Sequence, residues 1–498
     1  MTLDIISHRA FVIWLTYFSI FRSDPSQLRA FAVHHDLGTS YQLASLAATL
    51  RIKSGDAAGT DLGCISGIIT PSLGGTLEGV FAFLPLLVLV FLTLANILAS
   101  TYSPWGSTDI FRWTSNHGRD EDLLRLVTPG FADCLQYIQF IVLTGALSLS
   151  YPGYYQPVVS SGAWSILMFN QSFASHGGGI DPVVDGVYVV NGTYGLDLFR
   201  QYIGLESIRD VWPGSIIWLL VILFAVTALT QIAFGAQWIY HRMARVPEED
   251  LRSKNMPFTI GNIIRITFNF FLLPTLSLAL FQLVIAGNST AYAVALAVIL
   301  ILAILLFALW MIRLIVSARP RAYLFDDLPT VLLYGPLYNT YRDDVAPFAL
   351  VPIFITILRA IAIGALQPSG VAQVVLLAIC EVAMILLLVA FRPYPSPTSM
   401  NLYQLVFSLV RFLVVLLCVA FVPSLGISEQ TKGWIGYAIL VLHGGMLAFG
   451  FFLNALQTLI EVIARLAGAG GAEGGATRGG LTKVSLTHSS VCMRRTIY

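Results

Sequence analysis

Residues 291–312 read AYAVALAVILILAILLFALWMI, a continuous apolar run that contains no charged side chain. A helix of roughly 20 apolar residues crosses the hydrocarbon core of a bilayer and satisfies its own backbone hydrogen bonds there. The run therefore predicts a membrane-spanning helix. The whole composition agrees, because 56% of the residues are hydrophobic and only 11% are charged. Soluble proteins carry about 25% charged residues, so most of the surface of this chain faces lipid.

Further runs of this kind accompany residues 291–312. Together they predict an all-α polytopic membrane protein with about nine transmembrane helices, at residues 80–100, 130–150, 214–238, 264–286, 291–312, 347–366, 371–391, 402–422 and 434–456. They divide the chain into an external segment at residues 1–79, a membrane domain at 80–460 and a cytosolic tail at 461–498. The tail begins with a glycine-rich stretch that has no apolar surface to bury, so we expect it to be disordered.

Two independent signals orient the predicted spans. N-x-[ST] sequons accept glycans on the external or luminal side, and they occur between spans two and three and between spans four and five, at Asn170, Asn191 and Asn288. Arginine and lysine gather instead in the odd-numbered loops, which the positive-inside rule places in the cytosol. Both signals predict a glycoprotein with an external or luminal N-terminus and a cytosolic C-terminus.

The N-terminal segment contains a shorter apolar run, AFVIWLTYFSIF at residues 10–21. This run is too short to span a bilayer. It is either the apolar region of a signal peptide, although no small-residue cleavage site follows it, or a buried β-strand of an external domain.

Charge and motif content exclude several classes of function. The net charge of +1 provides no field that would attract nucleic acid. No His/Cys spacing resembles a metal site, and the sequence lacks G-x-x-x-x-G-K-[ST], H-E-x-x-H and G-x-S-x-G. We therefore expect no enzymatic activity, no metal site and no covalently bound cofactor. The expected partners are the lipid bilayer and the permeant ions or small-molecule cargo of a channel or carrier.

Charged or ionisable residues deep inside a predicted span are costly and are therefore candidates for function: Arg359, Glu381, Arg411 and His443. Arg359 and Glu381 flank the short turn at residues 367–370, about 12 and 15 Å below the outer surface at 1.5 Å per residue. Two antiparallel helices joined there should bring these side chains level, which predicts an ion pair between them. The cluster either fixes helix register or lines a gate or a cargo path. Excess positive charge does not suit a cation filter, so either the filter of a cation pore lies elsewhere or Arg359 and Arg411 face lipid headgroups through water.

A polar stripe opens span two. Asp133, Gln136 and Tyr137 are spaced by three and four residues, which places them near one face of a helix. This face either lines a vestibule entered from the cytosol or binds neighbouring helices together. Arg265 and Asn269 in span four allow the same alternatives, although Arg265 is close enough to the cytosolic end to extend its guanidinium into water.

Several short motifs together resemble the fungal TRP-like family, also called the flavin carrier family, whose membrane region is similar to polycystins. They cover roughly residues 64–460 and include SPWG at 103–106, TDIFRW at 108–113, PGF at 129–131, YPG at 151–153, YGPLY at 334–338 and FRPY at 391–394. The resemblance implies nine spans, an external lipid-recognition-like (ML-like) β-sandwich and a cytosolic tail. Because 79 residues are too few for the sandwich, residues 1–79 are expected to be a remnant of this ML-like domain.

The resemblance also implies function. We expect a TRP-like channel that conducts cations, with calcium as the permeant ion, in calcium homeostasis and cell-wall maintenance. The alternatives are a carrier of flavin (FAD) or lipid in an internal membrane and a non-conducting membrane scaffold. The compartment is the endoplasmic reticulum or the plasma membrane, and a homo-oligomer is expected. The segment between spans five and six either corresponds to a gating linker, with candidate residues Tyr334, Gly335, Pro336, Tyr338 and Arg342, or is an ordinary solvated loop.

Overall fold

The computed structural model describes residues 28–29, 46–54, 61–69, 75–102, 121–175, 179–184, 187–244, 251–319, 323–395 and 398–467. The run at residues 10–21 and residues 468–498 of the predicted tail lie outside these ranges, whereas residues 461–466, which we expected to be disordered, belong to the last helix. Strands in the described residues form two small antiparallel sheets, one of β1 (Leu28–Arg29), β2 (Leu46–Ser54) and β3 (Asp61–Ile69), the other of β4 (Val183–Val184) and β5 (Val187–Tyr188).

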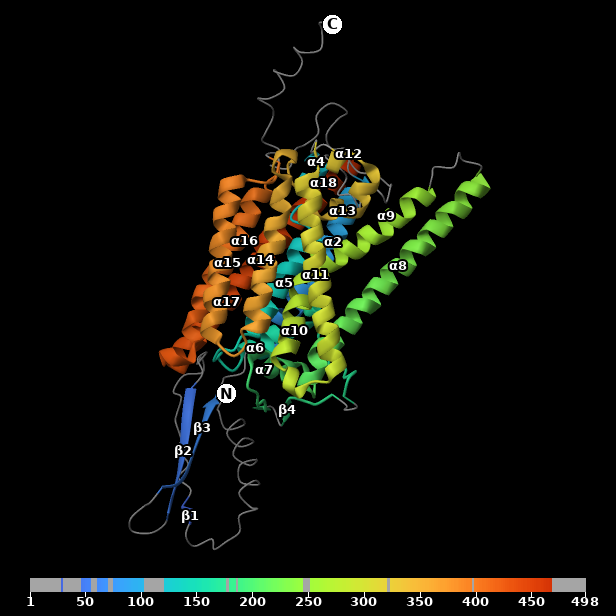
Figure 1. Cartoon of the computed structure of the whole chain (residues 1–498). Helices are drawn as coiled ribbons and strands as arrows, with labels where there is room; N and C mark the ends of the chain where they lie inside the picture. The colour runs from blue at the N-terminus through green and yellow to red at the C-terminus, as the bar shows by residue number, and fades with distance from the viewer. Residues whose placement is uncertain are drawn as a thin grey trace.

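Helices make up nearly all of the remaining ordered structure (Figure 1). The first half of the chain contributes α2 (Gly75–Tyr102), α4 (Glu121–Val127), α5 (Phe131–Gly145), α6 (Tyr155–Ser160), α7 (Gly195–Ile203), α8 (Val211–Ala244), α9 (Leu251–Ile264) and α10 (Leu272–Val284). The second half contributes α11 (Ala291–Ser317), α12 (Tyr323–Asp326), α13 (Leu328–Tyr338), α14 (Leu350–Ala360), α15 (Gly370–Phe391), α16 (Met400–Cys418), α17 (Glu429–Gly445) and α18 (Leu453–Leu466).

Within the described ranges, eight helices are long and apolar enough to cross a membrane, and a bent pair, Ser253–Phe270 with Leu272–Val284, makes a ninth span if it is counted as one. Each predicted apolar run coincides with one of these spans. The predicted fold class, an all-α polytopic membrane protein, is therefore confirmed. Span numbers below count the bent pair as span four.

The connections between spans gather at two opposite ends of the bundle. The odd-numbered ones include α4, α12, α13 and residues 392–395, which lie at the upper end in Figure 1 and define what we call the odd-loop face. The even-numbered ones include α6, α7 and β4 at the lower end, the even-loop face. The three sequon asparagines, Asn170, Asn191 and Asn288, are all exposed and belong to even-numbered connections.

Helix α5 lies at the centre of the bundle and α8 at its edge. In the most apolar 18-residue stretch of the span that contains α5, 61% is buried inside the protein. In the corresponding stretch of the span that contains α8, only 6% is buried. Figure 1 shows α8 leaning away from the bundle toward the odd-loop face, where α9 runs beside it. The apolar side chains along α8 therefore face lipid, and the polar residues of α5 face other helices.

Span four bends by 70° at Phe271, and its sequence explains the break. A π-helical turn at Arg265–Phe270 precedes Phe271, and Pro274 follows within the first turn of α10. Proline has no backbone N–H, so it cannot donate to the carbonyl four residues earlier, that of Phe270. The bend leaves carbonyl groups of the π-helical turn free to accept hydrogen bonds from a neighbouring helix.

Candidate functional site: a polar cavity at the odd-loop end of the bundle

A cavity of about 390 Å³ lies between spans one, two, four, six, seven and eight. Its volume is within the usual range for small-molecule sites, about 300–1,000 Å³. Residues from the odd-loop face form its mouth, among them Thr128, Tyr341, Tyr394 and Thr398. A narrower extension of about 30 Å³ continues toward mid-span, roughly the space of a single water molecule.

The bent span forms one wall of the cavity and is tied to α5 by side-chain amides. Gln136 donates through Nε2 to the carbonyl of Asn269 at 2.6 Å, and Gln139 donates to the carbonyl of Phe270 at 2.8 Å. The second of these carbonyls is the one that Pro274 leaves without a helical donor. Within the predicted polar stripe of span two, Gln136 lines the cavity and also joins two spans.

Asp133 lines the mouth of the cavity at the start of α5. Its Oδ2 accepts from the backbone N–H of Gly130 at 2.9 Å, and its Oδ1 accepts from Nε2 of Gln404 on α16 at 2.6 Å. A carboxylate at a helix N-terminus is favoured by the free N–H groups and by the helix dipole. The side chain therefore caps its own helix and holds span eight against span two.

Tyr137 departs from the vestibule hypothesis. Its side chain is fully buried and is not part of the cavity lining. Its hydroxyl lies 3.2 Å from Nδ1 of His443 in span nine, and the two rings meet edge to face at 5.8 Å. Gln136 and Tyr137 are about 100° apart around a helix of 3.6 residues per turn, so one faces the cavity and the other faces span nine. His443 likewise lies away from the cavity and the other three intramembrane candidates.

The predicted Arg359–Glu381 ion pair is confirmed and is part of a larger cluster. Arg359 Nη2 lies 2.7 Å from Glu381 Oε1, and Arg411 Nε lies 3.1 Å from Glu381 Oε2. Glu381 has no exposed surface, whereas both arginines line the cavity. Arg411 also donates to Ser408 Oγ at 3.0 Å and lies 5.8 Å from the ring of Phe140. A single carboxylate thus compensates two guanidinium groups inside the membrane domain.

Arg265 supplies a third guanidinium to the same cavity. We expected its side chain to extend toward water at the end of the span. Instead its Nη2 atom is enclosed and has no hydrogen-bond partner among the described residues. The π-helical turn changes the direction of this side chain relative to a straight helix, and hydropathy carries no signal for such a turn.

The segment between spans five and six is a helix, α13, and forms part of the cavity wall through Pro336 and Leu337. Asp327 caps it by accepting from the N–H of Thr330, and the carbonyl of Pro336 accepts from Asn269 Nδ2 at 2.6 Å. On α9, the Cα of Gly261 approaches so closely that an added Cβ would lie 2.0 Å from the carbonyl oxygen of Leu332.

The other linker candidates lie around this helix and not in the cavity. Tyr334 Oη accepts from Trp310 Nε1 at 3.2 Å, and the Tyr338 hydroxyl donates to the carbonyl of Leu324. Gly335 is buried in the second half of α13. Arg342 is exposed, and its hydrogen bond to Asp344 raises the pKa of the guanidinium further. Its backbone N–H donates to the carbonyl of Pro393 at 2.9 Å, so two odd-numbered connections are joined.

Two tyrosine rings, Tyr341 and Tyr394, lie at the mouth of the cavity with their centroids 5.2 Å apart. Burial raises the pKa of the Tyr341 hydroxyl to about 12 and that of Tyr394 well above its ordinary value. Both hydroxyls therefore stay neutral at physiological pH, and they add no negative charge to the mouth of the cavity.

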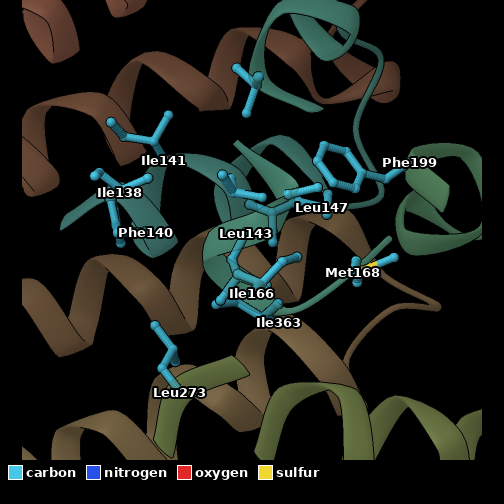
Figure 2. Close-up of a cluster of buried hydrophobic side chains, with 14 of the residues drawn as sticks. Ile138, Phe140, Ile141, Leu143, Leu147, Ile166, Met168, Phe199, Leu273 and Ile363 are labelled. Atoms are coloured by element: carbon cyan, nitrogen blue, oxygen red, sulfur yellow. The ribbon is translucent and has the colours of Figure 1, made fainter. Parts of the chain in front are cut away.

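An apolar layer of Phe140, Leu272 and Leu273 lines the deep extension, together with the polar side chain of Gln139. The three apolar residues are 2%, 3% and 7% exposed. The buried cluster to which they belong continues through the bundle, and Figure 2 shows part of it, with labelled side chains from α5, from α10 and from the π-helical turn Ile361–Ala365.

Fold and cavity together define a polytopic α-helical membrane protein with a charged cavity at the odd-loop end of the bundle and a narrower, water-sized extension toward mid-span. A family model described as transient receptor potential (TRP) ion channel matches residues 184–466, more than half of the chain. The chain therefore belongs to the TRP ion channel family.

Two curated proteins are similar to the chain. An uncharacterized membrane protein of Schizosaccharomyces pombe is 28% identical over 400 residues, which cover 78% of this chain and 46% of the relative. The TRP-like ion channel protein flc1 of Cryptococcus neoformans var. grubii is 25% identical over 240 residues, which cover 45% of this chain and 31% of the relative. The chain thus spans less than half the length of either relative. No solved structure matches it.

Proposed function

We propose that the protein is a TRP-like channel that conducts cations, with calcium as the permeant ion, and that it acts in calcium homeostasis and cell-wall maintenance. Family membership supports conduction. The single observation that carries the proposal to particular residues is the narrow deep extension of the cavity, whose lining includes the apolar side chains of Phe140, Leu272 and Leu273. Apolar constrictions gate channels by excluding water, so these residues would form the closed gate and the cavity its vestibule. Because arginine side chains outnumber carboxylates in the cavity, we place the selectivity filter elsewhere.

Current through the purified full chain in planar bilayers, with calcium as the only permeant cation, tests this proposal directly. Unitary currents with a calcium reversal potential would support it. A folded preparation that stays silent under applied voltage and after changes in membrane composition would contradict it.

A polar substitution in the apolar layer should open the path. We expect Leu273→Ser to raise the open probability several-fold, because a hydroxyl lowers the cost of filling the constriction with water. Single-channel recording measures the effect. Leu296→Ser is the matched control, since Leu296 on α11 is 52% exposed on the outside of the bundle. If Leu273→Ser folds normally and its open probability is unchanged, the gate does not lie at this layer.

The even-loop face is proposed to be external or luminal, with the C-terminus in the cytosol. We expect glycans on Asn170, Asn191 and Asn288, because all three are exposed on that face. Replacing all three by glutamine should abolish the mobility shift that endoglycosidase treatment produces in a gel. The orientation is the opposite of the proposed one if the wild-type protein carries no glycans and the even-numbered connections are protected from protease added outside.

A second candidate function is a carrier of flavin or lipid, and one observation favours it. Arg359 and Arg411 line the cavity, which suits an anionic cargo better than a cation. Uptake of labelled flavin or lipid into proteoliposomes, in the absence of ionic current, would select the carrier. A non-conducting scaffold would show neither activity. The homo-oligomer, the assignment of residues 1–79 to an ML-like remnant and the endoplasmic reticulum or plasma membrane as compartment are further proposals.

A further inference from the structure

Three guanidinium groups line the cavity, those of Arg265, Arg359 and Arg411, against one carboxylate, that of Asp133. The Asp133 carboxylate is engaged by Gly130 and Gln404. Glu381, which does not line the cavity, is shared between Arg359 and Arg411. One positive charge therefore remains uncompensated among these groups. A charge at this depth is costly unless a counter-charge or water reaches it.

Arg265 and Arg359, which line the cavity, also carry nitrogens that lack acceptors. Arg265 Nη2 and Arg359 Nε are enclosed and have no hydrogen-bond partner among the described residues. The 2.7 Å contact between Arg359 Nη2 and Glu381 has the distance of an ion pair without the angles of a hydrogen bond, so this nitrogen is also unsatisfied within the described part of the chain. Buried donors without acceptors are rare in proteins, and each is destabilising. The cavity is thus lined by guanidinium groups whose hydrogen-bonding capacity the described residues do not fill.

We propose that the cavity is a binding site for a phosphate group, held by Arg265 together with Arg359 and Arg411. The planar guanidinium donates two parallel hydrogen bonds and matches the oxygen spacing of phosphate, and several guanidiniums can share the three or four oxygens of one phosphate. Tyr341 and Tyr394, whose rings are in contact, line the site at the odd-loop end of the spans. Tyrosine is enriched at the level of lipid headgroups, so a phospholipid headgroup or a soluble phosphate could enter there.

The proposal goes beyond both transport functions, because it concerns a bound ligand and not a passage. A protein that conducts no current in planar bilayers could still bind phosphate, and a protein that binds no phosphate could still conduct calcium. The two proposals therefore fail independently. Arg265 is the residue that distinguishes this site from a purely structural cluster, since it makes no ion pair with Glu381.

The test is a thermal-unfolding titration of the purified full chain in detergent. Dihexanoyl phosphatidic acid represents a lipid headgroup, inorganic pyrophosphate represents a soluble phosphate, and hexanoate controls for a carboxylate on the same length of tail. We expect one of the two phosphates to raise Tm in a saturable manner. Which of the two does so identifies the ligand as a lipid headgroup or as a soluble phosphate. Arg265→Gln should weaken the apparent affinity about 10-fold, the size expected for losing one charge-assisted hydrogen bond. Arg313→Gln, which removes an exposed arginine from α11 outside the cavity, should leave the affinity unchanged.

A second measurement needs no variant and covers the case in which Arg265→Gln fails to fold. Phenylglyoxal modifies arginine side chains, and mass spectrometry reports the modification of each peptide. The stabilising phosphate should protect Arg265 and leave the exposed Arg313 reactive. The proposal is overturned if neither phosphate raises Tm, if hexanoate is as effective, if both variants weaken binding equally, or if the ligand leaves Arg265 unprotected.

Discussion

Glu381→Gln is expected to destabilise the protein by about 3–5 kcal/mol, the cost of leaving a buried charge without its partner. The carboxylate is the shared counter-charge of Arg359 and Arg411, at 2.7 and 3.1 Å, and it has no exposed surface. Its removal leaves two guanidiniums uncompensated at mid-span. The monodisperse fraction in fluorescence-detected size-exclusion chromatography, together with Tm, measures the effect, and both should fall sharply.

The opposite substitution in the same cluster should be mild. Arg359→Met leaves Glu381 paired one-to-one with Arg411 and removes a nitrogen, Nε, that has no hydrogen-bond partner among the described residues. We expect its folded yield to stay close to that of the wild type. Asp344→Asn, at the exposed pair with Arg342, controls for loss of any carboxylate. Equal yields for Glu381→Gln and Asp344→Asn would show that the cluster does not depend on its carboxylate.

Gly364→Ala should be the second most damaging single change, by about 3 kcal/mol, the upper end of the range for overpacking a core. Gly364 lies in the π-helical turn of span six, where an added Cβ would lie 2.0 Å from the carbonyl oxygen of Ser277 and 2.8 Å from its carbon. Both are backbone atoms of α10, so no rotamer change relieves the contact. The turn would have to move away from span four, and Tm should drop accordingly.

Gly235→Ala provides the matched control for this prediction. Gly235 is also in a spanning helix, α8, and an added Cβ there meets nothing within 4 Å. Alanine favours helix over glycine by about 1 kcal/mol, so this variant should be neutral or more stable. If the two variants unfold at the same temperature, close approach between spans four and six is not what holds this region together.

The spans and the ion pair were predictable from the sequence because both depend on local properties. Apolar length marks each span, and the tight turn at residues 367–370 forces Arg359 and Glu381 to the same level. The cavity was not predictable, because it depends on which helix faces meet. Helical spacing grouped Gln136 with Tyr137, yet packing sends one toward span four and the other toward His443.

The remaining differences come from local backbone changes that apolar periodicity does not reveal. Pro274 is the one sequence signal that could have indicated the break in span four, since it removes a helical donor just after Phe271. The break brings Arg265 into the cavity and frees the carbonyl that Gln139 occupies. The sequence did not indicate the helix α13 either, because its prolines and glycine are typical of a loop.

The exposed position of α8 has a mechanical consequence. The span that contains it covers 36 residues, about 54 Å at 1.5 Å per residue, against a hydrocarbon core of about 30 Å. Since so little of α8 touches protein, lipid thickness governs its tilt, and a thicker bilayer turns it toward the membrane normal. Helix α9 runs beside α8 and continues directly into the π-helical turn that carries Arg265. We therefore expect a change in membrane thickness to shift α9 and, with it, the part of the cavity wall that Arg265 forms.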